Sequence, residues 1–196
     1  MVMPCLQCAS ISTKGRGREV VHIRLAELAD IHQCVTIDAS FVTDHVWQMD
    51  GGESDWEVST AFRKVRLPRP MNVRYPRELD GLFDDWRLEE CFLVAASGES
   101  VIAYLDMTVQ KWSLAGWINH IVVHPEVRRK GIGTALLRAA GIWARENGLR
   151  NIIVETQTKN HPAVSFYQKN AYRFCGFNDQ YYTNQDIALF FALSIQ

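Results

Sequence analysis

The stretch IVVHPEVRRKGIGT, residues 121–134, is the part of the sequence that best defines the fold. Its first residues are apolar and β-branched, as in a buried strand, and a short basic loop with two glycines follows. Gly131 then opens the strongest helical pattern of the chain, an apolar stripe that ends before Gly148. Helix N-termini expose unpaired N–H groups and a partial positive charge. This strand–loop–helix unit therefore predicts a site for a phosphate-bearing ligand.

Two familiar phosphate motifs do not match this loop. A Walker loop needs the spacing G-x-x-x-x-G-K-[ST], which is missing here. A dinucleotide fingerprint needs a third glycine where Leu136 stands, and an early position in a strand–helix–strand unit. A simpler interpretation also stays open, in which Gly131 and Gly133 only pack the helix entry.

The regions around this unit predict a mixed α/β fold. Apolar runs predict strands over 20–25, 91–96, 101–109, 116–124, 151–155, 174–182 and 187–195. Helical periodicity predicts helices over 26–38, 79–88, 131–147 and 161–170, and residues 56–67 predict an extended arm. Antiparallel hairpins followed by a strand–helix–strand crossover imply a central mixed, mostly antiparallel sheet with helices on both faces.

Composition narrows the class of protein. The 196 residues carry a formal net charge of −1, and we expect a flexible leader over 1–18 and a single domain over 19–196. The near-neutral charge argues against nucleic-acid binding, and no apolar run approaches the about 18 residues of a membrane span. Five cysteines without framework spacing favour a reducing, cytoplasmic location. Cys5 and Cys8 form a lone C-x-x-C pair; we expect no metal site.

Two segments together resemble a known superfamily. The pattern Arg128-x-x-Gly131-x-Gly133 after a strand is similar to the acyl-CoA pyrophosphate loop of the GNAT N-acetyltransferases. The downstream segment Asn160-x-x-Ala163-x-x-Phe166-Tyr167 resembles the second conserved block of that superfamily. The resemblance covers residues 20 to 195 and implies a sheet of about seven strands in which one parallel pair splays apart.

Further sequence features resemble one subgroup and depart from the superfamily at one turn. VETQT (154–158) and DIALFF (186–191) look like the streptothricin-acetyltransferase-type members. The helix over 161–170 is followed by Ala171, where the superfamily usually has glycine. Because alanine disfavours the left-handed conformation, we expect the turn there to differ.

The resemblance implies acetyl-CoA as the cofactor and places it residue by residue. Backbone N–H groups would hold the pyrophosphate, beside the positive charge of Arg128, from Arg129, Lys130, Gly131, Ile132, Gly133 and Thr134. The pantetheine arm would pair like an added strand with Ile121, Val122 and Val123. The other side of the arm would be flanked by Asn160, Ala163, Phe166 and Tyr167.

Acetyl transfer to an amine needs a base for the amine and an acid for the leaving thiolate. The resemblance implies Tyr167 as the acid, and the alternative is a tyrosine that only packs its ring. Related sequences often carry a carboxylate where this chain has Asn119. The candidate bases are therefore His120, Glu155 and Asp106, with deprotonation through water as a further possibility.

Acidic and aromatic side chains suit a cationic acceptor, and the candidates are Phe41, Asp44, Trp47, Asp106 and Tyr181. We expect an N-acetyltransferase that acetylates a primary amine of a small antibiotic- or polyamine-like molecule by direct attack in a ternary complex. Its alternatives are a CoA-binding regulatory module without turnover and a dinucleotide-binding module. We expect no nucleic-acid or membrane partner, and the last strands are candidates for homodimer contacts.

Overall fold

The computed structural model describes residues 9–12, 20–77, 79–88 and 90–195, and it divides the chain into two compact units. Unit 1 comprises Met1–Ala39, Arg77–Val154 and Ala192–Gln196, and unit 2 comprises Ser40–Pro76 and Glu155–Phe191. The sequence predicts one domain over 19–196 and shows no sign of this division. Within the predicted leader, Ala9–Ser12 forms strand β1, whereas Cys5 and Cys8 lie outside the described residues.

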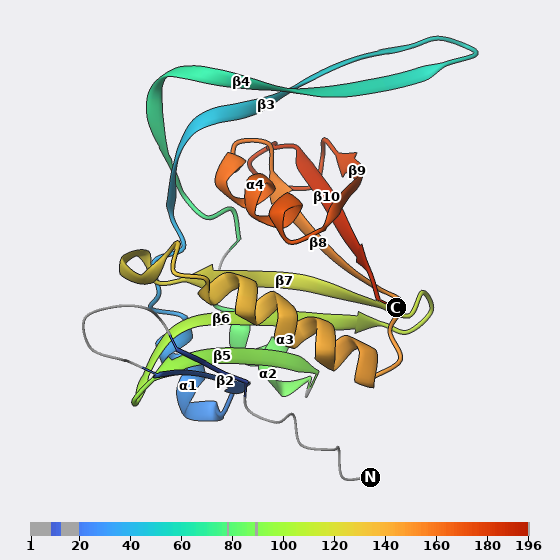
Figure 1. The fold of residues 1–196 in the computed structure, drawn as a ribbon. Helices are drawn as coiled ribbons and strands as arrows, with labels where there is room; N and C mark the ends of the chain where they lie inside the picture. Colours follow the sequence, from blue (N-terminus) through green and yellow to red (C-terminus); the bar gives the residue numbers. More distant parts are fainter. Residues whose placement is uncertain (1–8, 13–19, 78, 89, 196) are drawn as a thin grey trace. The chain divides into compact units, whose positions relative to one another are not determined.

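Most strands belong to one sheet, ordered β1-β2-β5-β6-β7-β8-β10-β9 (Figure 1). Their bounds are β2 (Val20–Leu25), β5 (Cys91–Ser97), β6 (Ser100–Gln110), β7 (Ala115–Val123), β8 (Asn151–Gln157), β9 (Arg173–Asn178) and β10 (Ala188–Ser194). Pairing is antiparallel from β1 through β7, and β7 pairs with β8 in parallel. The predicted mixed, mostly antiparallel sheet with one parallel pair is confirmed.

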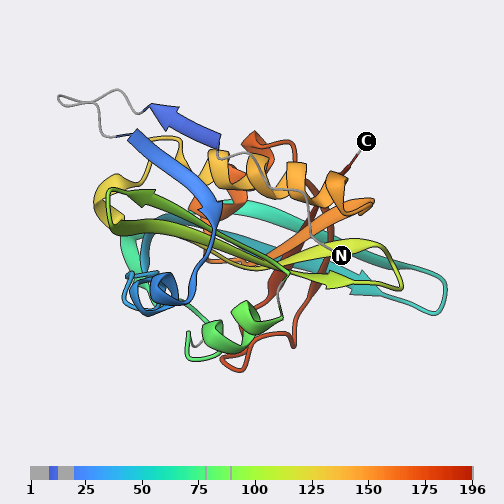
Figure 2. The same ribbon diagram turned by 90° about the horizontal axis from the view of Figure 1, so that it is seen from below.

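In unit 1, helices cover both faces of the sheet. Helix α3 (Ile132–Glu146) lies on one face, and α1 (Leu28–Cys34) and α2 (Leu82–Arg87) lie on the other (Figure 2). Because both faces are covered, the residues of β5 from Cys91 to Ala96 are all buried. Helix α3 buries Leu136 and Trp143 as predicted, but Ile142, predicted on the same stripe, is 45% exposed. Among the helices of the described residues, none combines the length and apolar character that a membrane crossing requires.

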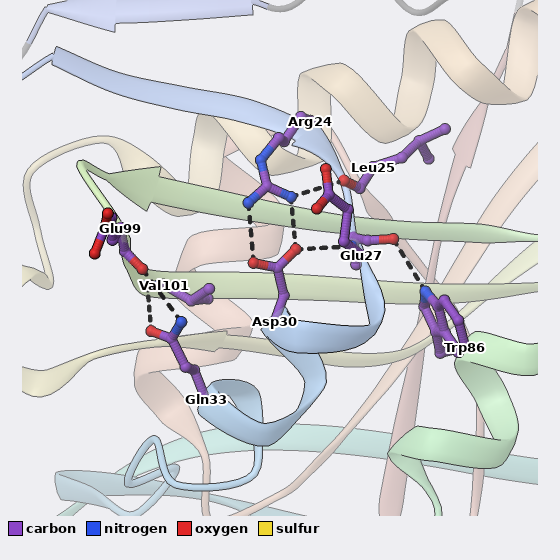
Figure 3. A network of polar contacts seen from close by, with 9 residues as sticks. Arg24, Leu25, Glu27, Asp30, Gln33, Trp86, Glu99 and Val101 are labelled. Atoms are coloured by element: carbon purple, nitrogen blue, oxygen red, sulfur yellow. Dashed lines mark hydrogen bonds and ion pairs between the residues drawn. The ribbon is translucent and has the colours of Figure 1, made fainter.

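A polar network fixes the start of α1 against its neighbours (Figure 3). Arg24 donates two hydrogen bonds to the carboxylate of Asp30, at 2.5 and 2.9 Å, and the Glu27 N–H donates a third at 2.7 Å. Gln33 donates to the Glu99 carbonyl and accepts from the Val101 N–H. These bonds replace the water that the helix N-terminus and the strand ends would otherwise need.

Unit 2 contains a long hairpin, helix α4 (His161–Lys169) and strand β9. The hairpin pairs β3 (Phe41–Glu53) with β4 (Val58–Val73) as a separate two-stranded sheet. The sequence analysis predicted only the second arm, because glycines at 51–52 and prolines at 68 and 70 looked like breaks. In a two-stranded sheet each strand has a free edge, where a proline costs no ladder hydrogen bond. Phe62 of β4 contacts the rings of Phe174 and Phe177.

Asp30 gives a test of the polar network. Burial by itself would raise the pKa of Asp30, but the hydrogen bonds from Arg24 and Glu27 lower it below the ordinary 3.8. A lowered pKa stabilises the folded state above the unfolded-state pKa, and this contribution is lost as the pH falls through the folded-state value. Asp30→Asn should therefore reduce the free energy of unfolding at pH 7 by about 1–3 kcal/mol.

Urea unfolding at pH 7 and at pH 3.5 measures this effect. The difference between wild type and Asp30→Asn should shrink at the lower pH, while Asp84→Asn, at an exposed position of α2, should change little at either pH. A difference that is constant with pH would show that the ionised pair does not stabilise this part of the fold.

Candidate functional site

The loop between β7 and α3 has the backbone of an anion-binding turn. A short 3-10 turn, η1 (Pro125–Val127), leads into it, and Arg129 and Gly131 adopt positive φ angles of 67° and 88°. Left-handed residues can turn backbone N–H groups of a loop toward one side, where an anion can bind. For Arg129, a residue with a Cβ, this conformation costs about 1–2 kcal/mol. Strain of this kind in an exposed loop is typical of functional sites.

Helix α3 begins directly after this loop and leaves its first N–H groups available. Gly131 is the N-cap and has no side chain to cap the helix, and the first turn contains no acidic residue. The first helical hydrogen bond joins the Ala135 N–H to the Gly131 carbonyl at 3.1 Å. The N–H groups of residues 132–134 therefore have no acceptor within the helix. The positive end of the helix dipole adds to the attraction for a phosphate.

Arg128 lies differently from the other two basic residues of the loop. Its guanidinium donates to the backbone carbonyls of Val123, at 2.9 Å, and Asp38, at 2.7 Å. Burial lowers the pKa of Arg128, although Asp38 opposes the shift. The side chain thus braces the loop, whereas Arg129 and Lys130 are exposed. The exposed positive charge of the loop is therefore supplied by these two residues more than by Arg128.

Strand β7 changes its pairing halfway along its length. Its parallel ladder with β8 ends at Ile118↔Val154, while its antiparallel ladder with β6 continues to Val123↔Ala103. The register with β6 shifts between these parts, so that Asn119 is an extra, bulged residue. Residues 121–123, predicted to pair with an extended ligand, therefore lie beyond the end of the β8 ladder.

The bulge brings together two of the predicted site residues, His120 and Asp106, which are cross-strand partners. Both are buried, and Asn119 donates to Asp106 Oδ1 at 3.4 Å. Burial, with the negative charge of Asp85, raises the pKa of Asp106 to about 8. Burial, with the positive charge of Arg77, lowers the pKa of His120 to about 4. His120 is therefore neutral at pH 7, and its lowered pKa makes it a weak base.

Asp85 and Arg77 act on these two residues, and neither was predicted from the sequence. Asp85 is half-buried on α2, and burial raises its pKa. An aspartate within the apolar run of β6 indicates that some partner is needed. It does not indicate which one, because the packing of α2 on β6 joins residues about twenty positions apart in the chain.

In unit 2, the predicted residues of α4 have structural roles of their own. Asn160 is the N-cap, and its side-chain oxygen accepts from the Ala163 N–H at 3.1 Å. The ring of Phe166 contacts that of Tyr167 at 5.5 Å between centroids. This cap defines where the helix begins. Asn160, which was predicted to flank the cofactor, uses its side-chain oxygen for the cap.

Tyr167 is 4% exposed and lies among the rings of Tyr172 and Phe191. Burial raises its pKa well above the ordinary value, and Tyr75 and Glu155 add to the shift. The phenol is therefore protonated at neutral pH, as a proton donor must be. Glu155, the other candidate base, is 7% exposed and belongs to the same unit.

The predicted acceptor-binding residues fall into separate groups. Trp47 lies near the ring of His161, which in turn contacts His45, the partner of Asp44 at 2.8 Å. Within the described part of the chain, Trp47 Nε1 is buried and has no hydrogen-bond partner. Phe41 pairs with Val73 at the start of the hairpin, and Tyr181 packs on Tyr182 and Phe190. Asp106 belongs to unit 1.

The turn after α4 corrects one expectation. Ala171 adopts a φ of 66°, the left-handed conformation that the missing glycine was expected to prevent. The Tyr172 N–H donates to the Tyr167 carbonyl at 3.0 Å and closes the turn. The turn is thus the usual helix end, built with a strained alanine.

Ala171→Gly should raise the free energy of unfolding by about 0.5–1 kcal/mol, because the relief of left-handed strain exceeds the added chain entropy. The same change at Ala163, in the first turn of α4, should lower it by about 1 kcal/mol. Urea denaturation measures both. Destabilisation by both variants would show that Ala171 is not strained.

The sequence of this chain is similar to those of known acetyltransferases. Residues 58–172 match the acetyltransferase (GNAT) family. The chain is 26% identical over 164 residues to the streptothricin acetyltransferase of Streptomyces lavendulae, covering 81% of this chain and 85% of that protein. It is 30% identical over 145 residues to a streptothricin acetyltransferase of Escherichia coli, covering 72% and 74%.

Solved structures agree in fold. A nourseothricin acetyltransferase superposes with a TM-score of 0.77 at 22% identity, covering 90% of this chain and 99% of that one. A Bacillus anthracis protein assigned as a streptothricin acetyltransferase, in complex with acetyl coenzyme A, gives 0.70 at 22% identity, covering 89% and 99%. Since the family match spans more than half of the sequence, the chain belongs to the acetyltransferase (GNAT) family and is an N-acetyltransferase.

Proposed function

We propose that this enzyme transfers the acetyl group of acetyl-CoA to a primary amine of a small molecule, by direct attack within a ternary complex. The observation that carries the proposal is the strand–loop–helix unit. Its exposed left-handed loop and uncapped helix N-terminus fit a pyrophosphate, and the strand before it has an edge that the β8 ladder leaves uncovered.

Acetyl-CoA is the acetyl donor of the family, and it supplies a thioester whose carbonyl carbon accepts the amine. The residues present fit this molecule. Arg129 to Thr134 would hold the pyrophosphate through backbone N–H groups, and Arg128 would keep the loop in place. The backbone of residues 121–123 would hold the pantetheine arm as an added strand. A strand N–H there would stabilise the developing oxyanion.

Two proton transfers accompany the reaction. The amine loses a proton as its nitrogen bonds to the carbonyl carbon, and the thiolate gains one as the C–S bond breaks. His120, which is neutral at pH 7, is the proposed base for the first transfer although its lowered pKa makes it a weak one, and Glu155 is the alternative. Tyr167 stays protonated at neutral pH and is the proposed donor for the second; this role rests on the family resemblance, because burial makes the phenol a weaker acid.

The acceptor is proposed to be a cationic small amine, because two relatives are named for streptothricin and the candidate residues include acidic and aromatic groups. Thiol release from acetyl-CoA should be assayed with streptothricin, spermidine, lysine and a peptide with a free N-terminus. Turnover with streptothricin or spermidine supports the proposal. Binding of acetyl-CoA without thiol release in any reaction would contradict it and support a regulatory module.

Gly133→Asp should weaken acetyl-CoA binding at least about tenfold, because its carboxylate would stand in the first turn of α3 beside the phosphates. Isothermal titration measures the affinity. Gly141→Asp adds the same charge farther along α3, where an added Cβ meets no atom within 4 Å, and should leave the affinity within about twofold. Equal losses in both variants would refute a pyrophosphate site at this helix start.

Tyr167→Phe should lower kcat about 10–100-fold while the KM for acetyl-CoA changes little, because the phenol proton is needed when the C–S bond breaks. Steady-state kinetics with the best acceptor test this. Tyr172→Phe is the matched control, since Tyr172 is also buried and contacts the Tyr167 ring. An unchanged kcat for Tyr167→Phe would remove Tyr167 from the acid role.

A further inference from the structure

Three polar side chains from three elements of unit 1 converge at the bulge of β7. They are Asp85 of α2, Asp106 of β6 and His120 of β7, and one polar atom of each lies within 4.8 Å of the other two. Asp106 and His120 are 2% and 5% exposed, while Asp85 is half-buried. The sequence separates Asp85 from His120 by a helix end and two strands, so only the folded chain assembles this group.

One atom of the cluster lacks a partner. Asp106 Oδ1 accepts from Asn119 Nδ2, but Oδ2 is buried and has no hydrogen-bond partner among the described residues. A buried acceptor without a donor costs about 1–3 kcal/mol. The neighbouring charges are the carboxylates of Asp85 and Glu90 and the guanidinium of Arg77. Burial and these two carboxylates keep the pKa of Asp106 raised in the empty site, and a ligand that brings positive charge and N–H donors would favour its ionised, accepting form.

The three acceptor atoms lie within 4.8 Å of one another, close enough for one small cation to contact all of them. An alkylammonium has three N–H donors in tetrahedral directions, one for each acceptor. The positive charge of Arg77 opposes a divalent ion more strongly than a monovalent one.

The cluster also lies at the correct end of β7. The loop at 129–131 and the strand edge at 121–123 follow His120 in order along the chain. A donor with its pyrophosphate on the loop and its arm along the strand would carry its thioester toward His120. The proposed site of the pantetheine arm and the cluster thus lie along one strand of one unit.

We propose that Asp85, Asp106 and His120 form the subsite that binds the acceptor as a primary ammonium group. This inference rests on the proposed function for the identity of the ligand. The carboxylates and the His120 ring accept the three N–H bonds and place the nitrogen next to the thioester end of β7. Asn119 supports the site by donating to Asp106 Oδ1, so that Oδ2 faces the ligand.

The test uses the purified full chain and n-butylammonium chloride as the probe, with n-butanol as its uncharged analogue. Binding is followed by NMR in the presence of saturating CoA. We expect n-butanol to bind at least about tenfold more weakly, and Asp106→Asn and Asp85→Asn to weaken n-butylammonium binding about tenfold. The affinity for acetyl-CoA should stay unchanged in both variants. Asp84→Asn, on the same helix but exposed, should bind the probe as the wild type does.

The proposal would be overturned if the wild type and both variants bound n-butylammonium equally well. It would also be overturned if the wild type bound n-butanol as tightly as n-butylammonium. One equivalent of Zn²⁺ that remains after dialysis and is lost in Asp106→Asn would overturn it in favour of a metal centre. Binding of the probe can be observed without its acetylation, so these outcomes do not depend on turnover. A wild type that binds the probe but releases no thiol with any amine would contradict the proposed function alone. Circular dichroism checks that the variants fold. Asp85→Asn should disturb the core less than Asp106→Asn, because Asp85 is only half-buried.

Discussion

Strand β7 receives backbone hydrogen bonds from two neighbouring strands up to Ile118 and from one neighbour beyond it. This constraint organises the rest of unit 1. The parallel ladder with β8 ends at Val154, and the extra residue Asn119 then shifts the register against β6. The backbone from 121 to 123 is left with an edge that an extended ligand can join, and the strand leads directly into the loop before α3. The bulge also sets His120 beside Asp106.

The charges of the site are separated along this strand. At its end, Arg129, Lys130 and the start of α3 make a positive, exposed surface for an anion. At the bulge, Asp106 is buried and Asp85 is half-buried, and burial raises the pKa of both. The formal net charge of −1 hides this arrangement, because opposite charges in different places cancel in the sum. Their placement suits an anionic donor and a cationic acceptor.

The main elements of the fold could be predicted from local patterns. The apolar stripe of α3, the hairpin of β5 and β6 and the β-branched run of β7 each bury one continuous side of a short segment, and such periodicity is visible in the residues alone. Strand β3 was missed, because Gly51 and Gly52 look like a break until the pairing with β4 is known. The left-handed conformation of Ala171 was not predicted for a related reason. The hydrogen bonds that close the turn offset the strain of this conformation, and they are not visible in the sequence.

The sequence by itself predicted a phosphate-binding loop and indicated the family and the acetyl donor, because each of these depends on short segments of the chain. A glycine two residues from another, followed by a helix start, needs no distant contact to present its N–H groups. Only the tertiary structure decided that Arg128 braces the loop, that Asn119 is a bulge, and that Asp85 stands beside Asp106 and His120. These facts depend on strand register and on the packing of α2 against the sheet. Such long-range contacts are set by the free energy of the whole core, and no short stretch of sequence encodes them.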